Sequence, residues 1–222
     1  MNISVAIRMW LAVILFSALT VCAADIGGVT SDGKSVILKE DGTWEYAKAP
    51  PSSTESDFRK AKWGMTKAQV KASETFTVTK DMGESILYTG TLASFDVVVG
   101  YVFAGGKLVR AVYLVNEEHM NKTDHITDYN SLKELLVKKY GEPAEDESYW
   151  KQDLYRDDPQ HWGMAISVGH LVYYTKWETD RTDITMALSG DNFEISHKIE
   201  YRSKNLGALE EKEKEAAAVG DL

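Results

Sequence analysis

The sequence predicts an α+β fold in which helices pack on an antiparallel sheet, and three observations support this prediction. A helix-start signal stands before residue 67, and a second helical pattern covers residues 129–140. Each helical segment is followed by short runs of alternating apolar residues separated by turn residues, as in β-meanders. The order helix, meander, helix, meander over residues 58–204 predicts two similar units, 58–120 and 121–204, related by an internal duplication.

The first helix has a clear start signal. Thr66 followed by Gln69 forms a capping box, in which a hydroxyl and an amide satisfy backbone N–H groups at the helix start. Met65 and Val70 stand at the two positions of a hydrophobic staple. These signals predict a helix that begins directly after Thr66.

Alternating apolar residues predict the strands of the first unit. The run Thr91–Phe103 places five of them on one face, Gly105-Gly106 forms a tight turn, and the run Leu108–Val115 returns as another strand. Two shorter strand candidates, Phe76–Lys80 and Ser85–Gly90, precede this hairpin. The first unit is therefore expected to be a helix followed by a meander.

The second unit is expected to begin with a helix over Tyr129–Tyr140. Asp128 is the expected cap at its start, and Gly141 and Pro143 end it. Alternation and turn residues then predict five strands. These strands are Ser148–Tyr155, Trp162–Val168, Leu171–Trp177, Thr182–Leu188 and Phe193–Tyr201.

Residues 1–24 have the pattern of a secretory signal peptide. Arg8 supplies a positive charge ahead of the apolar run Met9–Val21, which is too short to cross a bilayer comfortably. We therefore expect a periplasmic or secreted protein. The segment Leu19–Cys22 also resembles a bacterial lipobox, and in that alternative Cys22 is lipidated and the protein is a membrane-tethered lipoprotein.

Residues 25–48 are expected to form a short β-hairpin. The turn signals Asp32-Gly33 and Asp41-Gly42 flank an alternating run, and Trp44 follows in a second strand. A lone hairpin is only marginally stable in water. We therefore expect Trp44 to dock either on the main domain or on a partner.

Two segments flank the main domain, which is expected over residues 58–204. Residues 49–57 form a linker by composition, because Pro50-Pro51 and the Ser and Thr residues that follow do not favour burial. Residues 205–222 form a charged C-terminal tail, rich in Lys, Glu and Ala, that is expected to be a frayed helix or disordered.

Composition limits the partners and the chemistry of the folded part. The chain has 222 residues, of which 44% are hydrophobic and 27% charged, as in an ordinary globular protein. Its formal net charge of −9 disfavours nucleic acid and anionic membrane surfaces, because both are bound largely through Lys and Arg. The single cysteine, Cys22, leaves the folded part without a disulfide, a thiolate nucleophile or a cysteine zinc site. We expect no nucleic-acid partner, and membrane contact only if Cys22 is lipidated.

Several stretches resemble known families. WGMTKAQV, at Trp63–Val70, is similar to the G-M-T-x-x-x-V helix start of the SmpA/OmlA lipoproteins and of β-lactamase-inhibitor-like modules. This resemblance implies helix pairs on an antiparallel sheet and a role in binding other proteins. The pattern DGK…DGTWEY resembles an N-terminal element of many exported bacterial proteins. KYGEP, WGMAISVG, TKWETDRTDITMAL and IEYRS resemble a family of uncharacterised exported (periplasmic) bacterial proteins, which implies export but no particular activity.

No motif of a common catalytic class occurs in the sequence. The G-x-S-x-G elbow, the P-loop, the dinucleotide fingerprint and HExxH are all absent. One polar loop contains His119, Asp124 and His125, which are candidate metal ligands, although charged loops are usually only solvated. His197 falls on the apolar face of the last strand, as is typical of a core histidine whose hydrogen bonds are satisfied. We predict no catalytic residues, no bound metal and no cofactor.

Aromatic residues are concentrated in the second unit. Trp150, Trp162, Tyr174 and Trp177 are the candidate binding residues, because Tyr and Trp commonly anchor interfaces. Alternation places Tyr173 and Tyr174 on opposite faces of the sheet, so one face is expected to be core and the other a partner or ligand surface. In the alternative interpretation the second helix covers one face and the remaining rings line the sheet edges.

These observations favour a non-enzymatic exported protein. We expect a protein–protein interaction module of the cell envelope that binds another envelope protein through an aromatic sheet face. One alternative is a small-ligand binding or sensing protein, which requires an enclosed pocket between sheet and helices. A second alternative is a hydrolase, which requires two groups with shifted pKa values in one cleft.

Overall fold

The structure is a computed structural model that describes these residues: 26–29, 35–38, 42–46 and 56–220. The expected signal peptide, Cys22 and most of the expected linker lie outside the described residues. The chain divides into two compact units, Met1–Ala47 and Lys48–Leu222, and each is described by itself.

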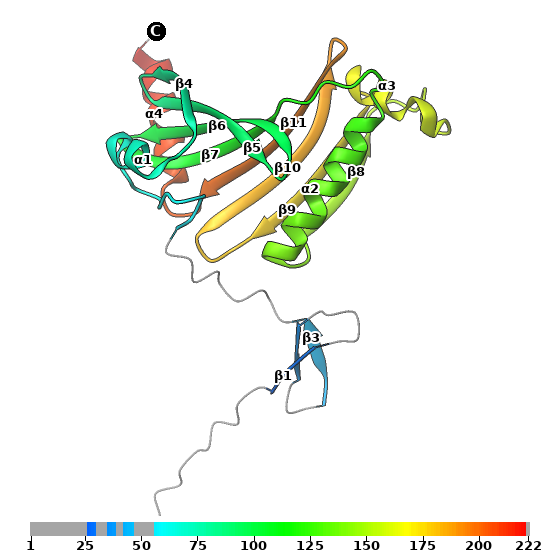
Figure 1. The fold of residues 1–222 in the computed structure, drawn as a ribbon, viewed down its shortest axis with the longest axis horizontal. Helices are drawn as coiled ribbons and strands as arrows, with labels where there is room; N and C mark the ends of the chain where they lie inside the picture. Colours follow the sequence, from blue (N-terminus) through cyan, green and yellow to red (C-terminus); the bar gives the residue numbers. More distant parts are fainter. Residues whose placement is uncertain (1–25, 30–34, 39–41, 47–55, 221–222) are drawn as a thin grey trace, which may run out of the picture. The chain divides into compact units, whose positions relative to one another are not determined.

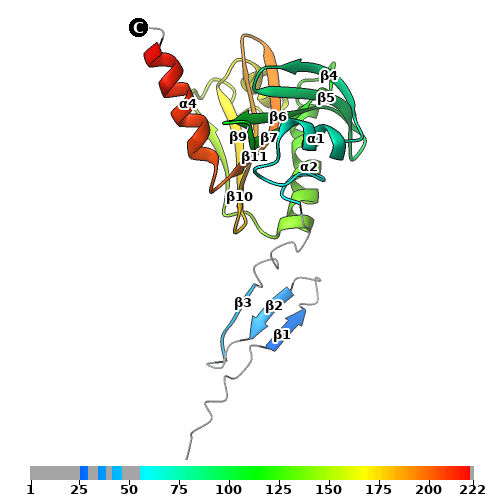
Figure 2. The same ribbon diagram turned by 90° about the vertical axis from the view of Figure 1, so that its left-hand side faces the viewer.

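The described part of the first unit is a small antiparallel sheet (Figure 2). Its strands are β1 (Ile26–Val29), β2 (Ser35–Leu38) and β3 (Trp44–Tyr46). They pair in the order β1-β2-β3, with Ile26 opposite Leu38 at one end of the first ladder. Strand β1 therefore adds a third strand to the two that the turn signals predict.

The second unit is built on one eight-stranded antiparallel sheet, and its fold is α+β (Figure 1). The strand order is β4-β5-β6-β7-β11-β10-β9-β8, so the first four strands form a meander and the last strand pairs with β7. The strands are β4 (Thr77–Met82), β5 (Ser85–Leu92), β6 (Phe95–Ala104), β7 (Lys107–Val115), β8 (Glu145–Trp150), β9 (Leu171–Glu178), β10 (Thr182–Asp191) and β11 (Glu194–Ser203).

Alternation along the strands explains why one face of this sheet is core. On β6, Val97 and Val99 are buried while Val98 between them is only half-buried. On β10, Ile184 and Met186 are fully buried in the same way. Because successive side chains point to opposite faces, these residues define an inner face, and the intervening residues define an outer face.

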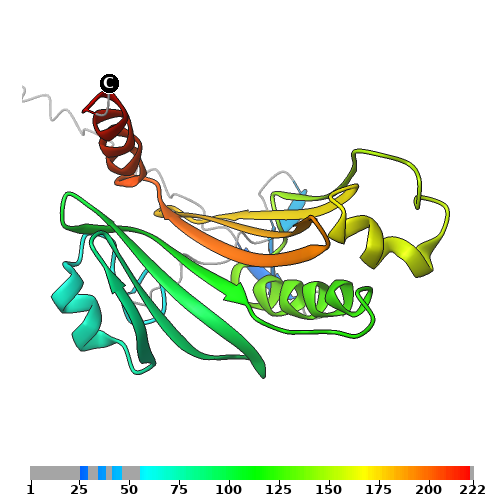
Figure 3. The same cartoon turned by 90° about the horizontal axis from the view of Figure 1, so that it is seen from above.

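Helices cover the two faces of the sheet unequally (Figure 3). Helices α1 and α2 lie against the inner face, and α4 lies on the outer face, where it contacts β6 and β7. None of the described helices combines the length and the apolar character needed to cross a bilayer. The helices are α1 (Lys67–Ser73), α2 (Asp124–Tyr140), α3 (Trp162–Ser167) and α4 (Gly207–Gly220), and a 3-10 turn, η1, spans Pro159–His161.

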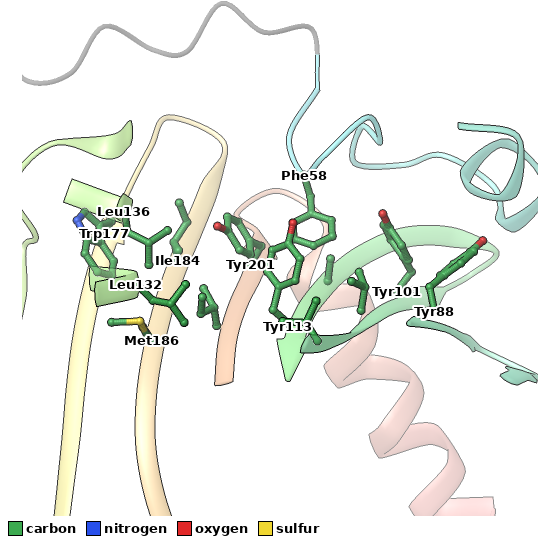
Figure 4. Packing of buried hydrophobic residues seen from close by; sticks show 14 of the residues in the cluster. Phe58, Tyr88, Tyr101, Tyr113, Leu132, Leu136, Trp177, Ile184, Met186 and Tyr201 are labelled. Atoms are coloured by element: carbon green, nitrogen blue, oxygen red, sulfur yellow. The ribbon is translucent and has the colours of Figure 1, made fainter. Parts of the chain in front are cut away.

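Aromatic rings join the two halves of the core (Figure 4). The Phe58 ring lies 5.4 Å from that of Tyr101, 4.9 Å from that of Tyr113 and 4.8 Å from that of Tyr201. Tyr101 and Tyr113 come from the first meander, whereas Tyr201 comes from β11. Each such ring pair contributes roughly 0.5–1.5 kcal/mol beyond the area that it buries. The inner face therefore carries one continuous core rather than two.

The predicted start of α1 and the predicted end of α2 are confirmed. The backbone N–H of Thr66 donates to Gln69 Oε1 at 2.8 Å, and the N–H of Gln69 donates to Thr66 Oγ1 at 3.4 Å, which completes the capping box. Gly141 ends α2 with φ of 83°, a left-handed conformation that glycine adopts without strain, and its N–H donates to the carbonyl of Val137 at 2.8 Å.

Two predicted elements of the second half are wrong. Helix α2 begins at Asp124 rather than after Asp128, so it takes in five residues that the sequence analysis assigns to a polar loop or to the cap. The predicted strand Trp162–Val168 is instead the short helix α3. Six residues with apolar alternation do not distinguish a strand from a short buried helix.

Gly163 explains how α3 reaches its place. A Cβ at this position would lie 2.2 Å from the backbone nitrogen of Thr123 and 2.3 Å from the carbonyl carbon of Lys122. Only glycine allows the two backbones to approach so closely. This contact joins α3 to the loop that leads into α2.

The C-terminal tail forms helix α4 over Gly207–Gly220, so of the two expectations, a frayed helix or disorder, the structure shows the helix for these residues. Glu210 is 5% exposed, and its carboxylate accepts hydrogen bonds from Arg110 Nη2 at 2.7 Å and Arg110 Nε at 3.0 Å. Such a bidentate pair is stronger than an isolated surface contact. A polar anchor that composition does not reveal therefore attaches α4 to β7.

Candidate functional site

Trp177 is not on a binding surface. Its side chain is 1% exposed and belongs to the core, and its Nε1–H donates to the carbonyl of Gly141 at 3.0 Å. Alternation correctly predicts that Trp177 lies on the same face as Tyr173, but helix α2 covers that face. The prediction that Trp177 is a binding residue is therefore corrected, because its indole cannot reach a partner.

Trp150 and Trp162 pack on each other at the end of the core. Their ring centroids lie 5.9 Å apart in an edge-to-face arrangement, and both side chains are half-buried against core residues. Trp150 stands opposite Leu171, which is 1% exposed, so it belongs to the inner side of the sheet. Trp162 Nε1 donates to the carbonyl of Arg156 at 3.1 Å. These contacts give both residues a packing role.

Tyr174 lies on the outer face, away from the three tryptophans. It stands between Glu147 on β8 and Ala187 on β10. The row continues across the sheet, because Ala187 is opposite Lys198 and Lys198 is opposite Leu114. Cross-strand neighbours lie about 5 Å apart, so these side chains form one band on the outer face.

A small apolar surface surrounds Tyr174, and we call it the outer-face patch. Tyr149 is 44% exposed and stands opposite Val172, which lies two residues before Tyr174 on β9 and on the same face. Leu114 is 38% exposed, at the far end of the row, where Lys198 separates it from Ala187. The sequence analysis misses Tyr149 and Leu114 as site residues, although the same period-2 alternation places both of them on the Tyr174 face. The patch consists of Leu114, Tyr149, Val172, Tyr174 and Ala187.

Ion pairs border the outer-face patch. Lys176 Nζ lies 2.7 Å from Glu178 and 3.8 Å from Glu145. The side-chain hydrogen bond with Glu147, with a smaller effect of burial, raises the pKa of Tyr149 to about 12. The phenol is therefore neutral at pH 7, and the patch offers neutral rings inside a charged border, the composition of an interface core and its rim.

A second cluster of chemically active side chains lies where the loop after β7 enters α2. One donor atom from each of His119, His125 and Asp128 lies within 4.8 Å of the other two. His119 Nε2 is 2.5 Å from Asp128 Oδ2, and the His119 and His125 ring centroids are 4.6 Å apart. The third candidate ligand is Asp128 rather than the predicted Asp124. Helix α2 begins early enough to include residues 125 and 128, and their spacing places them on one helix face.

His197 lies behind this cluster, on β11. It is 3% exposed, and its ring centroid lies 5.5 Å from that of Tyr129 on α2. The predicted place on the core face is confirmed, and neither ring nitrogen has a hydrogen-bond partner among the described residues. Burial lowers the pKa of His197 to about 4, and burial also lowers the pKa of His125. Both rings are therefore neutral at pH 7.

A hollow of about 240 Å³ lies between the segment before α1, the end of α2 and the β9–β10 turn. Its lining includes Asp57, Arg59, Tyr140 and Arg181, and Asp57 forms an ion pair of 2.9 Å with Arg181. Pockets that enclose small ligands usually have volumes of roughly 300–1,000 Å³. The hollow is therefore a weak basis for small-ligand binding.

The Glu74 carboxylate lies in a network of hydrogen bonds that links the end of α1 to the sheet. Glu74 accepts hydrogen bonds from Arg59 Nε at 2.8 Å, Arg59 Nη2 at 3.0 Å and the Tyr101 hydroxyl at 2.5 Å. Burial alone would raise the pKa of Glu74, but these bonds and two backbone N–H donors outweigh it and lower the pKa. A carboxylate held ionised by so many donors is a poor general acid or base at neutral pH. Glu74 therefore gives no support to a hydrolase.

Comparison of the chain with protein-family models, with curated proteins and with solved structures finds no match. The geometry of the described residues is thus the basis for the proposals below.

Proposed function

We propose that this chain is a non-enzymatic, exported (periplasmic) interaction module that binds another cell-envelope protein through the outer-face patch. The observation that carries the proposal is the position of Tyr149 and Tyr174 together on an outer face that no described helix covers over β8, β9 and β10 (Figure 3). The helices instead cover the inner face, where the core lies.

The chemistry of the patch suits a protein partner. Tyrosine gives a large contact area with only two side-chain torsions, so little entropy is lost when it is held at an interface. The surrounding ion pairs of Lys176 and Lys198 offer charges that orient a partner without having to be buried. A neutral centre with a charged rim is therefore the feature that a partner would recognise.

The area of the exposed outer face predicts how strongly a partner protein binds to it. Strands lie about 4.8 Å apart and rise about 3.3 Å per residue, so the exposed outer face of β8 to β10 covers roughly 380 Å². Stable complexes bury about 800 Å² per partner. The interaction is therefore expected to be weak and transient, unless the partner also reaches the Leu114 end of the patch.

The order of elements supports a duplication. Helix α1 precedes the strands β4 to β7, helix α2 precedes β8 to β11, and the last strands of the two sets, β7 and β11, pair with each other. We infer that residues 58–120 and 121–204 are two copies of one unit, with α3 inserted in the second. This order agrees with the resemblance to the SmpA/OmlA and β-lactamase-inhibitor-like modules, and the signal-peptide pattern supports export.

Loss of partner capture tests the function. The tagged chain would be crosslinked in intact cells and the captured envelope protein identified. We expect Tyr149→Ser combined with Tyr174→Ser to abolish capture of that protein. Leu154→Ser is the matched control, because Leu154 is 72% exposed but lies outside the patch. Equal capture by the double variant and the wild type would contradict the proposal, and so would a failure to capture any envelope protein.

A further inference from the structure

Three metal-ligating side chains meet where the chain enters α2. His125 and Asp128 are three residues apart on one face of the helix, and His119 reaches them from the preceding loop. All three are half-buried, so they are sheltered but not sealed from solvent. We propose that His119, His125 and Asp128 bind a first-row divalent transition-metal ion such as Zn²⁺.

The distances between the ligand atoms allow a zinc ion to bind after small movements of the side chains. A zinc ion lies about 2.0–2.2 Å from imidazole nitrogen and carboxylate oxygen, so its ligand atoms lie about 3–3.5 Å from one another. The donor atoms of the cluster already lie within 4.8 Å of one another. Rotation of the His125 ring and separation of the His119–Asp128 hydrogen bond would bring all three to bonding distance without moving the backbone of α2.

The ligand types select the class of metal. Two imidazoles and one carboxylate suit Zn²⁺ and its first-row neighbours, whereas Ca²⁺ and Mg²⁺ prefer sites made of oxygen alone. A set of three protein ligands also leaves a coordination position for water or for a group from a partner. Asp124, in the same helical turn, adds a second negative charge near the site, which favours a cation.

His197 is an independent observation that points to a ligand here. It is a buried side chain with two polar atoms that lack hydrogen-bond partners among the described residues, and the charges of Asp128 and His125 act on it. An unpaired buried polar atom is costly, so proteins rarely retain one without a reason.

Titration with Zn²⁺ followed by calorimetry tests the proposal. The chain would be purified without a histidine tag and stripped with chelator. We expect one Zn²⁺ per chain, and at least a tenfold weaker affinity for His125→Ala and for Asp128→Asn. His161→Ala is the matched control, because His161 also pairs with an aspartate, Asp158 at 2.7 Å, but has no third ligand, and we expect it to bind as the wild type does.

Thermal unfolding distinguishes a variant that lacks a metal ligand from a variant that fails to fold. Addition of Zn²⁺ should raise the melting temperature of the wild type and of His161→Ala but not that of His125→Ala, while the metal-free variants should melt close to the wild type. Cobalt(II) absorption in the visible range should show nitrogen and oxygen ligands in the wild type and in His161→Ala, but not in His125→Ala. Absence of Zn²⁺ binding by the wild type, or equal binding by all four proteins, would overturn the proposal.

Discussion

At the residue scale, Glu74 joins three separate parts of the fold through its carboxylate. It is 3% exposed and joins the end of α1 to Arg59, before that helix, and to Tyr101 on β6. Its hydrogen bonds compensate for the burial of its charge. Removal of either Glu74 or Arg59 would leave the other charge buried without its partner. That loss lowers the stability of the fold by more than the ion pair itself contributes.

We predict that Glu74→Gln lowers the free energy of unfolding by about 3 kcal/mol, because the Arg59 guanidinium loses its counter-charge. Urea unfolding followed by circular dichroism measures this change. Glu84→Gln is the control, because Glu84 is exposed and its replacement is expected to change stability by less than about 0.5 kcal/mol.

The pH dependence of the stability of Glu74→Gln tests whether the charge of Glu74 causes the stabilisation. The pKa of Glu74 is lower in the folded chain than its usual value of 4.5, so the unfolded state binds the proton more readily. The stability that Glu74 contributes is present above pH 4.5 and is lost as the pH falls below it. Glu74→Gln should therefore lose less stability than the wild type between pH 5 and pH 3. Parallel curves would show that the charge of Glu74 is not the cause.

At the scale of elements, α4 is attached to the sheet largely through charged side chains, among them Glu211, which pairs with Arg202 on β11. Glu210 is its buried anchor, with Arg110 on β7 as the partner, and Glu213 adds a contact to the backbone N–H of Gly105. A helix with few apolar contacts opens more easily than the core. The Arg110–Glu210 pair is the buried member of this set, so we expect its loss to weaken the attachment of α4 most.

We predict that Glu210→Ala releases α4 while the sheet stays folded, because hydrogen bonds to charged groups contribute about 1.5–3 kcal/mol. Limited trypsin digestion should then cleave at Lys212 faster than in the wild type, whereas Glu215→Ala, an exposed position on the same helix, should leave the rate unchanged. Equal rates for Glu210→Ala and the wild type would show that other contacts hold the helix.

Elements with strong local signals are the ones that the sequence predicts well. The capping box at Thr66 and the glycine at 141 mark helix ends through contacts between near neighbours in the chain, and period-2 alternation marks most strands. The start of α2 is missed because residues 124–128 are polar except for Ile126 and read as a loop. Helix α3 is missed because six residues with apolar alternation do not distinguish a short helix from a strand, and its close contact through Gly163 is with a distant segment.

At the scale of the whole molecule, the site depends on long-range pairing that no local pattern contains. Alternation places Tyr174 on a face, but only the pairing of β7 with β11 and the position of α2 show which face is exposed. Trp177 is buried for the same reason. The histidine cluster likewise requires His119, His125 and Asp128 to be brought together by a helix that begins earlier than predicted.

The central claim is that the outer-face patch touches another envelope protein, and site-specific photocrosslinking in living cells tests it most directly. A photoreactive amino acid would replace Tyr149, Tyr174 or Leu114 in turn, with Leu154 and Met120 as exposed positions away from the patch. We predict the same crosslinked envelope protein from the three patch positions and none from the two controls. Crosslinks only from the controls, or no adduct from any patch position, would contradict the proposed interaction.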